Sequence, residues 1–272
     1  MSRNGIGILV FGGGKIMKTW MAFLKKEWME WVRTGRFAIL GILFVVFGIM
    51  NPAIAKLTPW LFEVMAESLE ETGLIVSSVH VDALTSWTQF FKNIPMGLIA
   101  FVLICSGIVT KEYQSGTLVL VLTKGLKRSK VLTAKVTLLM IAWSTCYWGN
   151  YLITYGYNAY FWDNSIVKHL LFSAVCWWMF GIWVITLLVL FSAILDTNTA
   201  VLGATGSVVI VTYLVGLFPK LAKYFPTTLM DGMVIVSGME EPSAYRIVVW
   251  IACIWSILNV ILSLRILNKK QM

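Results

Sequence analysis

The sequence has little charge, few histidines and few cysteines for its length. Only 13% of its 272 residues are charged, and two are histidine, whereas soluble domains carry about 25% charged residues. The hydrophobic share is 58%, against roughly 45–50% in soluble domains. A soluble core of this length cannot bury so much apolar surface. The composition therefore excludes an ordinary soluble protein and predicts that lipid surrounds much of the chain.

Motifs for catalysis and nucleotide binding are also missing. The chain contains no GxxxxGK[ST] phosphate-binding loop, no HExxH and no GxSxG. His80 and His169 have no metal-ligand spacing, and the four cysteines form no CxxC pair and fall within apolar runs. We interpret the cysteines as small apolar residues without a disulfide or metal role. These absences argue against an intramembrane enzyme, and we expect no cofactor or metal in this chain.

Six apolar runs are long enough to cross a bilayer as helices, which takes about 20 residues each. They cover approximately residues 37–55, 90–109, 131–155, 169–195, 200–218 and 247–267. The second run reaches this length when Trp87, Phe90 and Phe91 form its interfacial entry turn. The sequence thus predicts an all-α integral membrane protein with six transmembrane helices in a single domain, residues 17–268.

The basic residues predict the orientation of these spans. A formal charge of +9 suggests nucleic acid as a partner in a soluble protein, but here the basic residues cluster beside apolar runs. If both termini are cytoplasmic, 16 of the 22 Lys and Arg lie inside and nine of the 13 acidic residues lie outside. Lys and Arg are enriched in cytoplasmic loops. We therefore expect a multi-pass protein of a bacterial plasma membrane, with both termini cytoplasmic and no nucleic-acid partner.

Residues 1–16 form an uncertain leader. They read MSRNGIGILVFGGGKI, which is apolar and glycine-rich but too short to span a membrane. A purine-rich ribosome-binding site translated in frame would also give Gly-Gly-Gly-Lys shortly before a methionine. Translation that starts at Met17 is therefore the alternative, and an intact mass of the native protein distinguishes the two.

Residues 17–34 predict an amphipathic helix in the membrane interface. Trp20, Trp28 and Trp31 recur with other apolar residues at three- and four-residue intervals, and Lys25 and Lys26 lie on the opposite face. We expect the aromatic side chains among lipid headgroups and the basic ones against anionic lipid. A plain positively charged anchor is the alternative.

The loop between the second and third runs predicts a short docking helix. Ser115, Gly116 and Thr117 break the preceding helix and can cap a new one. This new helix has an apolar face formed by Leu118, Leu120 and Leu122. Such a face on the cytosolic side fits a groove in a partner protein, although the loop could also fold back on its own bundle.

Two outer segments complete the pattern. Residues 56–93 predict a separate acidic amphipathic helix, with Pro59 in its first turn and Trp60 and Glu63 on opposite faces. Residues 228–238, before the last run, are too short to cross the bilayer. They predict a segment that dips in from the outer face and returns, which is tolerated where protein or water lines it.

Polar residues within the runs are the candidates for a substrate path. They either link helices or touch cargo, and they are Ser144, Thr145, Asn150, Thr186 and Asn259. The abundant aromatics suit an amphiphilic cargo, such as a peptide, an antibiotic or a lipid-like molecule. Ion-coupled carriers need ionisable groups at membrane depth, and the runs have none away from their ends. A secondary transporter is therefore disfavoured, and a non-transporting receptor or immunity protein is the other alternative.

Taken together, these features resemble the membrane subunit of type-2 ABC exporters. That family has an amphipathic elbow helix, six spans, a cytoplasmic coupling helix after span two and a broken outer segment before span six. The stretch Glu112-Tyr113-Gln114-Ser115-Gly116-Thr117-Leu118 is similar to the family's acidic-x-x-x-Gly-Thr loop. Leu122, Gly125, Arg128 and Lys135 match its later positions, although a proline common before the basic residue is absent here.

The resemblance implies a division of labour between subunits. A separate ABC ATPase, in two copies, would bind ATP and Mg, and a second permease copy would complete a homodimer or pseudo-dimer. The ATPase would press on the elbow helix and on the coupling residues, which are Lys111, Glu112, Ser115, Gly116, Thr117, Leu118, Leu120 and Leu122. The implied function is export driven by ATP hydrolysis in the partner.

Overall fold

The computed structural model describes residues 10–70, 81–108, 110, 114, 116, 123 and 127–270. Every regular element among these residues is a helix. The long helices are α1 (Val10–Arg33), α2 (Arg36–Glu70), α3 (Ala83–Cys105), α6 (Arg128–Phe161), α7 (Leu170–Ile194), α8 (Asn198–Gly216) and α11 (Arg246–Lys269). The short ones are η1 (Asn164–Ile166), α9 (Pro219–Ala222), η2 (Pro226–Met230), α10 (Gly232–Val236) and η3 (Pro242–Tyr245).

Six of the helices are long and apolar enough to span a membrane: α2, α3, α6, α7, α8 and α11. The shortest of them, α8, has 19 residues, which gives a length of about 28 Å at 1.5 Å per residue. This is close to the thickness of the hydrocarbon core, about 30 Å. The prediction of an all-α protein with six transmembrane helices is therefore confirmed.

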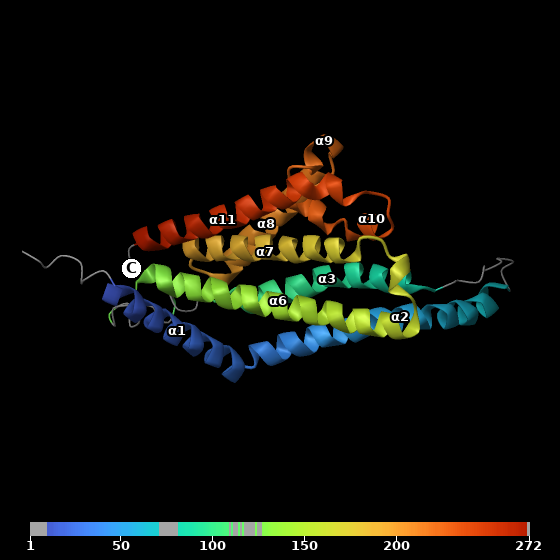
Figure 1. Cartoon of the computed structure of the whole chain (residues 1–272), viewed down its shortest axis with the longest axis horizontal. Coiled ribbons are helices and arrows are strands. Elements are labelled where there is room, and N and C mark those ends of the chain that lie inside the picture. The colour runs from blue at the N-terminus through green and yellow to red at the C-terminus, as the bar shows by residue number, and fades with distance from the viewer. Residues whose placement is uncertain are drawn as a thin grey trace, which may run out of the picture.

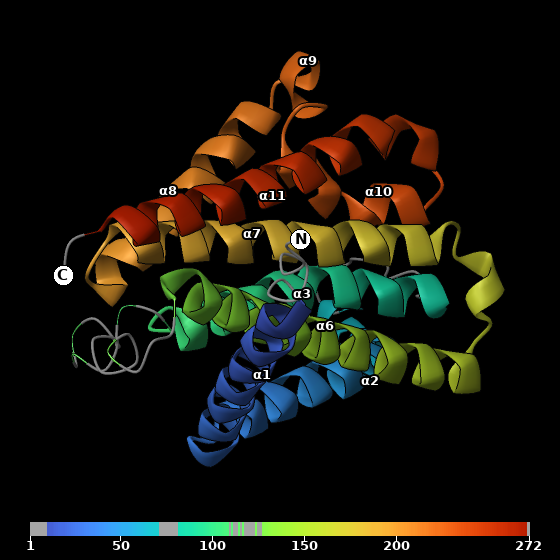
Figure 2. The same ribbon diagram turned by 60° about the vertical axis from the view of Figure 1, so that its left-hand side comes forward.

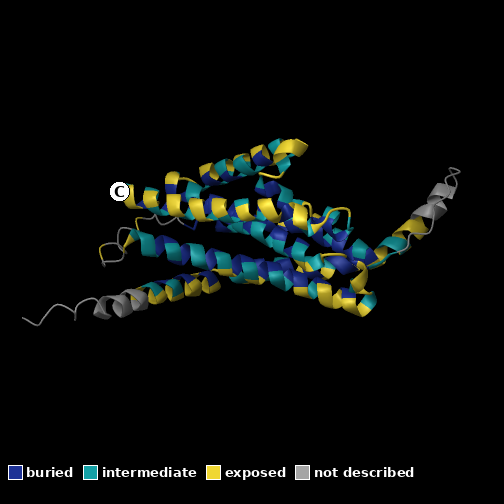
Figure 3. Cartoon of the chain, turned by 45° about the horizontal axis from the view of Figure 1, so that its top comes forward, coloured by how far each residue is buried: buried dark blue, intermediate teal, exposed yellow. Residues whose placement is uncertain are grey.

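The bundle is organised around α6 and α7. Helices α2 and α3 pack against α6, whereas α8 and α11 pack against α7 (Figures 1 and 2). Helix α7 carries apolar residues on all faces, as expected for a central helix. Figure 3 shows buried residues concentrated in the middle of the bundle and exposed ones along the outer helices. The exposed outer faces suit contact with lipid.

Trp143 of α6 lies at the centre of this packing. Its ring is fully buried and meets Phe44 of α2 at 5.9 Å and Phe101 of α3 at 5.5 Å, both edge to face. Its Nε1 donates a 3.1 Å hydrogen bond to the backbone oxygen of Trp178 in α7. A Cβ at Gly181 would lie 2.2 Å from the ring. The small residue at 181 therefore lets one tryptophan join three helices.

Helix α2 continues through two prolines, which corrects one expectation. The acidic segment predicted as a separate helix starting near Pro59 is the continuation of the first span as far as Glu70. Pro52 has no N–H to donate to the carbonyl four residues earlier, that of Gly48. The hydroxyl of Thr154 in α6 donates to this carbonyl oxygen at 3.1 Å. A neighbouring helix thus replaces the hydrogen bond that the proline removes.

Residues 219–245, which we call the far-end cap, fold back onto α7. Trp177 of α7 donates from Nε1 to the backbone oxygen of Met230 at 2.9 Å, and Ser173 donates to that of Gly232 at 3.1 Å. Leu229 and Ile235 of the cap are fully buried. The segment before the last span therefore packs against α7, and its re-entry into the membrane stays a prediction.

Candidate coupling surface and substrate path

The two ends of the bundle differ in charge and connectivity. We call the end that holds Arg128, Asp196 and Lys270 the basic end, and the end that holds Asp163 and the far-end cap the far end. Helix α1 lies at the basic end and crosses α6 at an angle (Figure 2). The turn at Gly35, with φ of +73°, lets the chain change direction from α1 into α2.

The α1 tryptophans lie in different surroundings. Trp31 is buried against the protein, with its ring 5.2 Å from that of Phe37 in a tilted contact, and Trp20 donates to the hydroxyl of Thr133 in α6 at 3.1 Å. Only Trp28 is exposed, together with Lys25 and Lys26. The elbow residues predicted to contact lipid are thus divided between a face that holds α1 on α6 and an exposed face.

A buried ion pair joins α1 to α6. Glu27 and Lys135 are only 2% and 3% exposed, and Oε2 of Glu27 lies 2.8 Å from Nζ of Lys135. Burial alone would raise the pKa of Glu27, but the charge and hydrogen bond of Lys135, with help from Lys26, lower it below its ordinary value. Glu27 therefore stays ionised at neutral pH. Sequence reasoning missed this pair because its partners are 108 positions apart.

The turn between α7 and α8 connects three segments at the basic end. Nε2 of Gln114 donates to the backbone oxygen of Asp196 at 3.0 Å, and Thr110 donates to the side chain of Asn198. Nζ of Lys270, just after α11, lies 2.6 Å from Oδ1 of Asp196. Thr110 and Gln114 of the loop that follows α3 are therefore tied to the turn between α7 and α8, which Lys270 also contacts.

Arg128, at the start of α6, connects this helix to the end of α11. Its guanidinium donates to the backbone oxygen of Leu267 at 3.2 Å and to that of Lys270. Leu267 lies in the last turn of α11 and Lys270 is the residue just after it, where helix carbonyls lack partners within the helix. The basic position after the expected docking segment thus holds the end of α11 in place.

Most of the expected coupling residues lie outside the described residues. These are Lys111, Glu112, Ser115, Thr117, Leu118, Leu120 and Leu122. Gly116 is described and exposed, with φ of +66°, a conformation that favours glycine. This geometry is consistent with the predicted end of the preceding helix at Gly116. The docking helix itself stays a prediction.

The polar residues proposed for a path are mostly engaged in contacts between helices. Asn259 of α11 donates to Thr186 of α7 at 3.2 Å, and Ser144 of α6 accepts from Nε1 of Trp178 at 3.0 Å. Asn150 lies buried within a network described below, and Thr145 is exposed on α6. The structure thus brings these residues to several helix contacts and not to a single cavity.

A buried amide network links α2, α3 and α6. Asn51 of α2 donates to Thr154 at 3.0 Å and to Asn150 at 3.4 Å, and it accepts from Asn93 of α3 at 2.8 Å. Sequence reasoning missed Asn51 and Asn93. Asn51 could have been noticed, because it lies within an apolar run directly before Pro52. A proline leaves a helix carbonyl without its backbone partner, and polar neighbours are needed to pair with it.

An apolar groove lies between α3, α7 and α8. It has a volume of about 340 Å³, and its lining includes Leu98 and Val102 of α3, Phe180 of α7 and Val209 of α8. The outward side of α8 is also apolar, and Ile210 is 60% exposed. This face suits lipid or another apolar helix.

The far-end cap carries a crowded acidic site. Asp231 lies between η2 and α10, and although its side chain reaches the surface, desolvation by the surrounding chain and the charge of Glu240 raise its pKa to about 6. His169 and Glu241 approach each other nearby, with Nε2 3.6 Å from Oε2. The cap therefore holds a carboxyl that changes charge in the mildly acidic range.

Replacing Asp231 with Asn should raise the melting temperature by a few degrees at pH 7.5 and by clearly less at pH 4.5. The raised pKa of this carboxyl in the folded state means that its contribution to stability is fully present below its unfolded pKa, about 3.9. This stabilisation by the protonated carboxyl is lost as the pH rises through about 6, where Asp231 ionises in the folded protein. The amide imitates the protonated form at every pH. The measurement is a series of melting curves in detergent.

Asp163→Asn is the matched control, because hydrogen bonds from Ser165 lower the pKa of Asp163. This change should lower the melting temperature slightly at pH 7.5 and should not raise it. An equal gain for Asp231→Asn at pH 4.5 and at pH 7.5 would contradict the assignment.

Within the described residues, no group of three or more His, Cys, Asp or Glu side chains could hold a metal ion. The cysteines are free, and Cys105, Cys146 and Cys176 are buried while Cys253 is partly buried. Burial of such thiols fits their interpretation as small apolar residues.

Comparison with known proteins agrees with this architecture. Residues 21–270 match the model of a family described as "ABC-2 family transporter protein". The chain is also similar to the uncharacterized transmembrane protein YxlG of Bacillus subtilis (strain 168), with 22% identity over 215 residues. That alignment covers 77% of this chain and 81% of YxlG. The family match includes residues 21–33 of α1, all six spanning helices and the far-end cap. The chain therefore belongs to the ABC-2 family of transporter proteins.

Proposed function

We propose that this chain is the permease subunit of an ATP-driven exporter and that a separate ABC ATPase supplies the energy. Its membership in the ABC-2 family and its six spanning helices support this proposal. ATP and Mg would be bound by two ATPase subunits, because the sequence has no phosphate-binding loop. This permease would contribute the path and the surface that the ATPase presses on.

The basic end faces the cytoplasm in this proposal. Arg128, Lys135 and Lys270 lie at this end with the basic residues of α1, in keeping with the enrichment of Lys and Arg in cytoplasmic segments. Both termini are then cytoplasmic, at the plasma membrane of a bacterial cell. The far-end cap, with Asp231, Glu240 and Glu241, faces outward.

The contacts of the 110–127 segment at the basic end carry the proposal. This segment joins α3 to α6, and its residues Thr110 and Gln114 are hydrogen-bonded to the turn between α7 and α8. A push on the segment would therefore reach α3, α6, α7 and α8 together. The Glu27–Lys135 pair would transmit a push on α1 to α6. Such shared contacts are what a coupling surface requires, because displacement of one element must bias the others.

A second permease copy would complete the path. The apolar groove between α3, α7 and α8, together with the exposed side of α8, is the surface we assign to it. Thr145 is exposed on a different helix, and Ser144, Asn150, Thr186 and Asn259 are candidates for cargo contact where helices separate during transport. An amphiphilic peptide, an antibiotic or a lipid-like molecule is the cargo class that aromatic and apolar surfaces favour.

The test is co-purification with the ATPase encoded beside the gene, through an affinity tag on the permease. We expect a stable complex in detergent that is lost when Leu118, Leu120 and Leu122 are all changed to Asp. Leu217→Asp is the control, since this side chain is 62% exposed at the far end and should not affect the complex. A folded permease that retains no ATPase would refute the proposal and favour a receptor or a carrier.

A further inference from the structure

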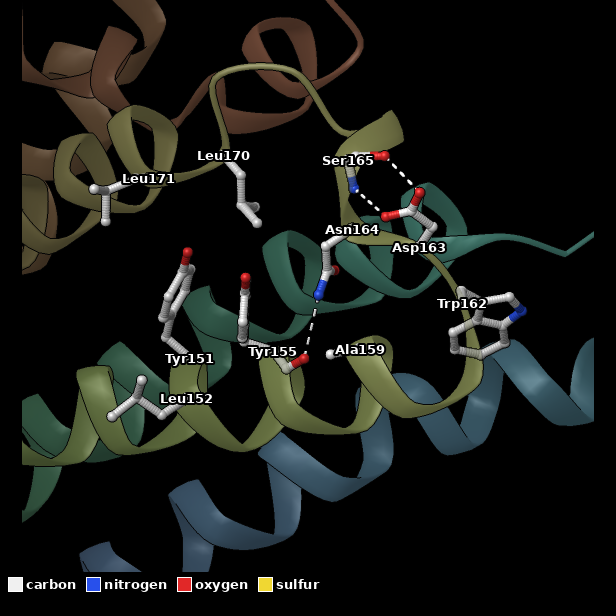
Figure 4. Close-up of a pocket in the computed structure, with 10 residues that line it drawn as sticks. All are labelled: Tyr151, Leu152, Tyr155, Ala159, Trp162, Asp163, Asn164, Ser165, Leu170 and Leu171. Carbon is white, nitrogen blue, oxygen red and sulfur yellow. Dashed lines mark hydrogen bonds between the residues drawn. The ribbon is translucent and has the colours of Figure 1, made fainter.

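An open groove lies at the far end, between the last turns of α6 and the first turn of α7. Its volume is about 710 Å³, and the linker that contains η1 forms part of its wall. Figure 4 shows its lining, with the hydroxyls of Tyr151 and Tyr155 pointing from α6 toward Leu170 and Leu171 of α7. The groove is separate from the α3–α7–α8 groove, with which it shares no lining residue.

The two ends of the groove differ in polarity. Leu152 and Leu171, at one end, are 63% and 62% exposed. The two tyrosine hydroxyls come next, and Asp163 lies beyond the end of the helix (Figure 4). From Leu152 to Phe161 the helix rises roughly 14 Å at 1.5 Å per residue. The contrast between the apolar end and the charged end parallels the change from the hydrocarbon core to the headgroups of the nearby leaflet. Ala159, Trp162 and Leu170 add apolar lining closer to the charged end.

The walls of the groove are held in place before any ligand binds. Nδ2 of Asn164 donates to the backbone oxygen of Tyr155 at 3.3 Å, and its Oδ1 accepts from Nε1 of Trp87 at 3.0 Å. Tyr151 stacks on Tyr155 at 6.2 Å and packs on Trp87 at 5.1 Å. Pre-formed walls reduce the entropy lost on binding.

The charge of the groove is negative. Among its ten lining residues, Asp163 is the charged one. Its carboxylate accepts hydrogen bonds from the backbone N and the hydroxyl of Ser165, at 2.8 and 2.6 Å. These bonds lower the pKa of Asp163 and keep it ionised at neutral pH. Tyrosine rings add negative π faces, which attract cations.

We propose that this groove binds an amphiphile with an ammonium head, taken from the leaflet at the far end. The apolar chain lies along Leu152 and Leu171, the ammonium lies toward Asp163, and the rings of Tyr151 and Tyr155 line the middle. Charge complementarity selects the cation, and the contrast between the apolar end and the charged end sets the orientation. The site requires neither an ATPase nor a second permease, so it stands independently of the proposed function.

The test uses two photoreactive probes with matched chains, a diazirine sphingosine with an ammonium head and a diazirine fatty alcohol without charge. The permease is placed in phosphatidylglycerol nanodiscs, which contain no ammonium lipid, and labelled peptides are mapped by mass spectrometry. We expect sphingosine to label the 151–171 region and Asp163→Asn to reduce that labelling at least 5-fold. Labelling by the alcohol should be weaker and unchanged by the substitution. Asp231→Asn, which removes a carboxylate elsewhere at the far end, should leave both patterns unchanged.

A competition experiment on the unmodified chain removes any dependence on folding of the variant. Dodecyltrimethylammonium should displace the sphingosine probe from this region, and uncharged dodecyl maltoside at the same concentration should not. Equal labelling by both probes, unchanged labelling of Asp163→Asn, or equal displacement by both competitors would each overturn the proposal and identify ordinary lipid contact.

Discussion

Replacing Lys135 with Met should lower the free energy of unfolding by about 3–5 kcal/mol. Glu27 would lose its main partner in a buried site and keep only the half-exposed Lys26, 2.9 Å away, and removal of one member of a buried ion pair typically has this cost. The side chains of Glu27 and Lys135 are 2% and 3% exposed, so water cannot replace the lost contact. The measurement is unfolding of the purified chain by sodium dodecyl sulfate, followed by tryptophan fluorescence.

Two companion variants separate charge from packing. Glu27→Gln combined with Lys135→Met should recover most of the loss, because no uncompensated charge stays buried. Lys25→Met, on the exposed side of α1, should change stability by less than about 0.5 kcal/mol. A Lys135→Met protein as stable as the Lys25→Met protein would show that the pair contributes little.

The acid sensitivity of this pair has a definite sign. The pKa of Glu27 is lowered in the folded protein, so its stabilisation is complete above its unfolded pKa, about 4.3. It is lost as the pH falls through the lowered folded pKa. This dependence is opposite to that of Asp231, whose raised pKa adds stability at acidic pH.

Replacing Gly181 with Ala should destabilise the protein by about 1–3 kcal/mol, as overpacked cores usually do. The new methyl group would lie 2.2 to 2.6 Å from atoms of the Trp143 indole. The ring has little room to move, because it contacts Phe44 and Phe101 and donates to the backbone of Trp178. Loss of that hydrogen bond would leave a polar N–H unpaired in the bilayer interior.

Gly203→Ala is the matched control for this substitution. A Cβ at Gly203 of α8 would meet nothing within 4 Å, and alanine favours helix over glycine by roughly 0.5–1 kcal/mol. Melting curves should therefore show a lower midpoint for Gly181→Ala and an equal or higher midpoint for Gly203→Ala. Equal midpoints would mean that Trp143 can shift without cost.

The six spans could be predicted from the sequence because the bilayer imposes a simple rule. Backbone groups without water must be paired within the segment, so long apolar runs become helices. The same rule did not locate the end of the first helix, because a proline such as Pro59 is typical of the first turn of a new helix. The chain continues through Pro52 to Glu70, and Thr154, more than 100 positions away, supplies a hydrogen bond to the carbonyl of Gly48.

The candidate site was predictable only in part, for a similar reason. The match around residues 112–135 identified Arg128 and Lys135, but their partners were not visible in the local pattern. Arg128 caps α11, and Lys135 pairs with Glu27. The polar residues of the spans stood out in the sequence, but their contacts depend on which faces of the helices meet. Periodicity gives a helix its faces, but tertiary packing decides which faces are in contact.

The central claim is that the permease couples to an ATPase through its basic end. The most direct measurement is ATP hydrolysis by the neighbouring ATPase in lipid nanodiscs, with and without the permease. The account predicts a rate that rises at least several-fold with the permease and returns to the unassisted value when Leu118, Leu120 and Leu122 are changed to Asp. A rate that is the same with and without a folded permease would contradict it.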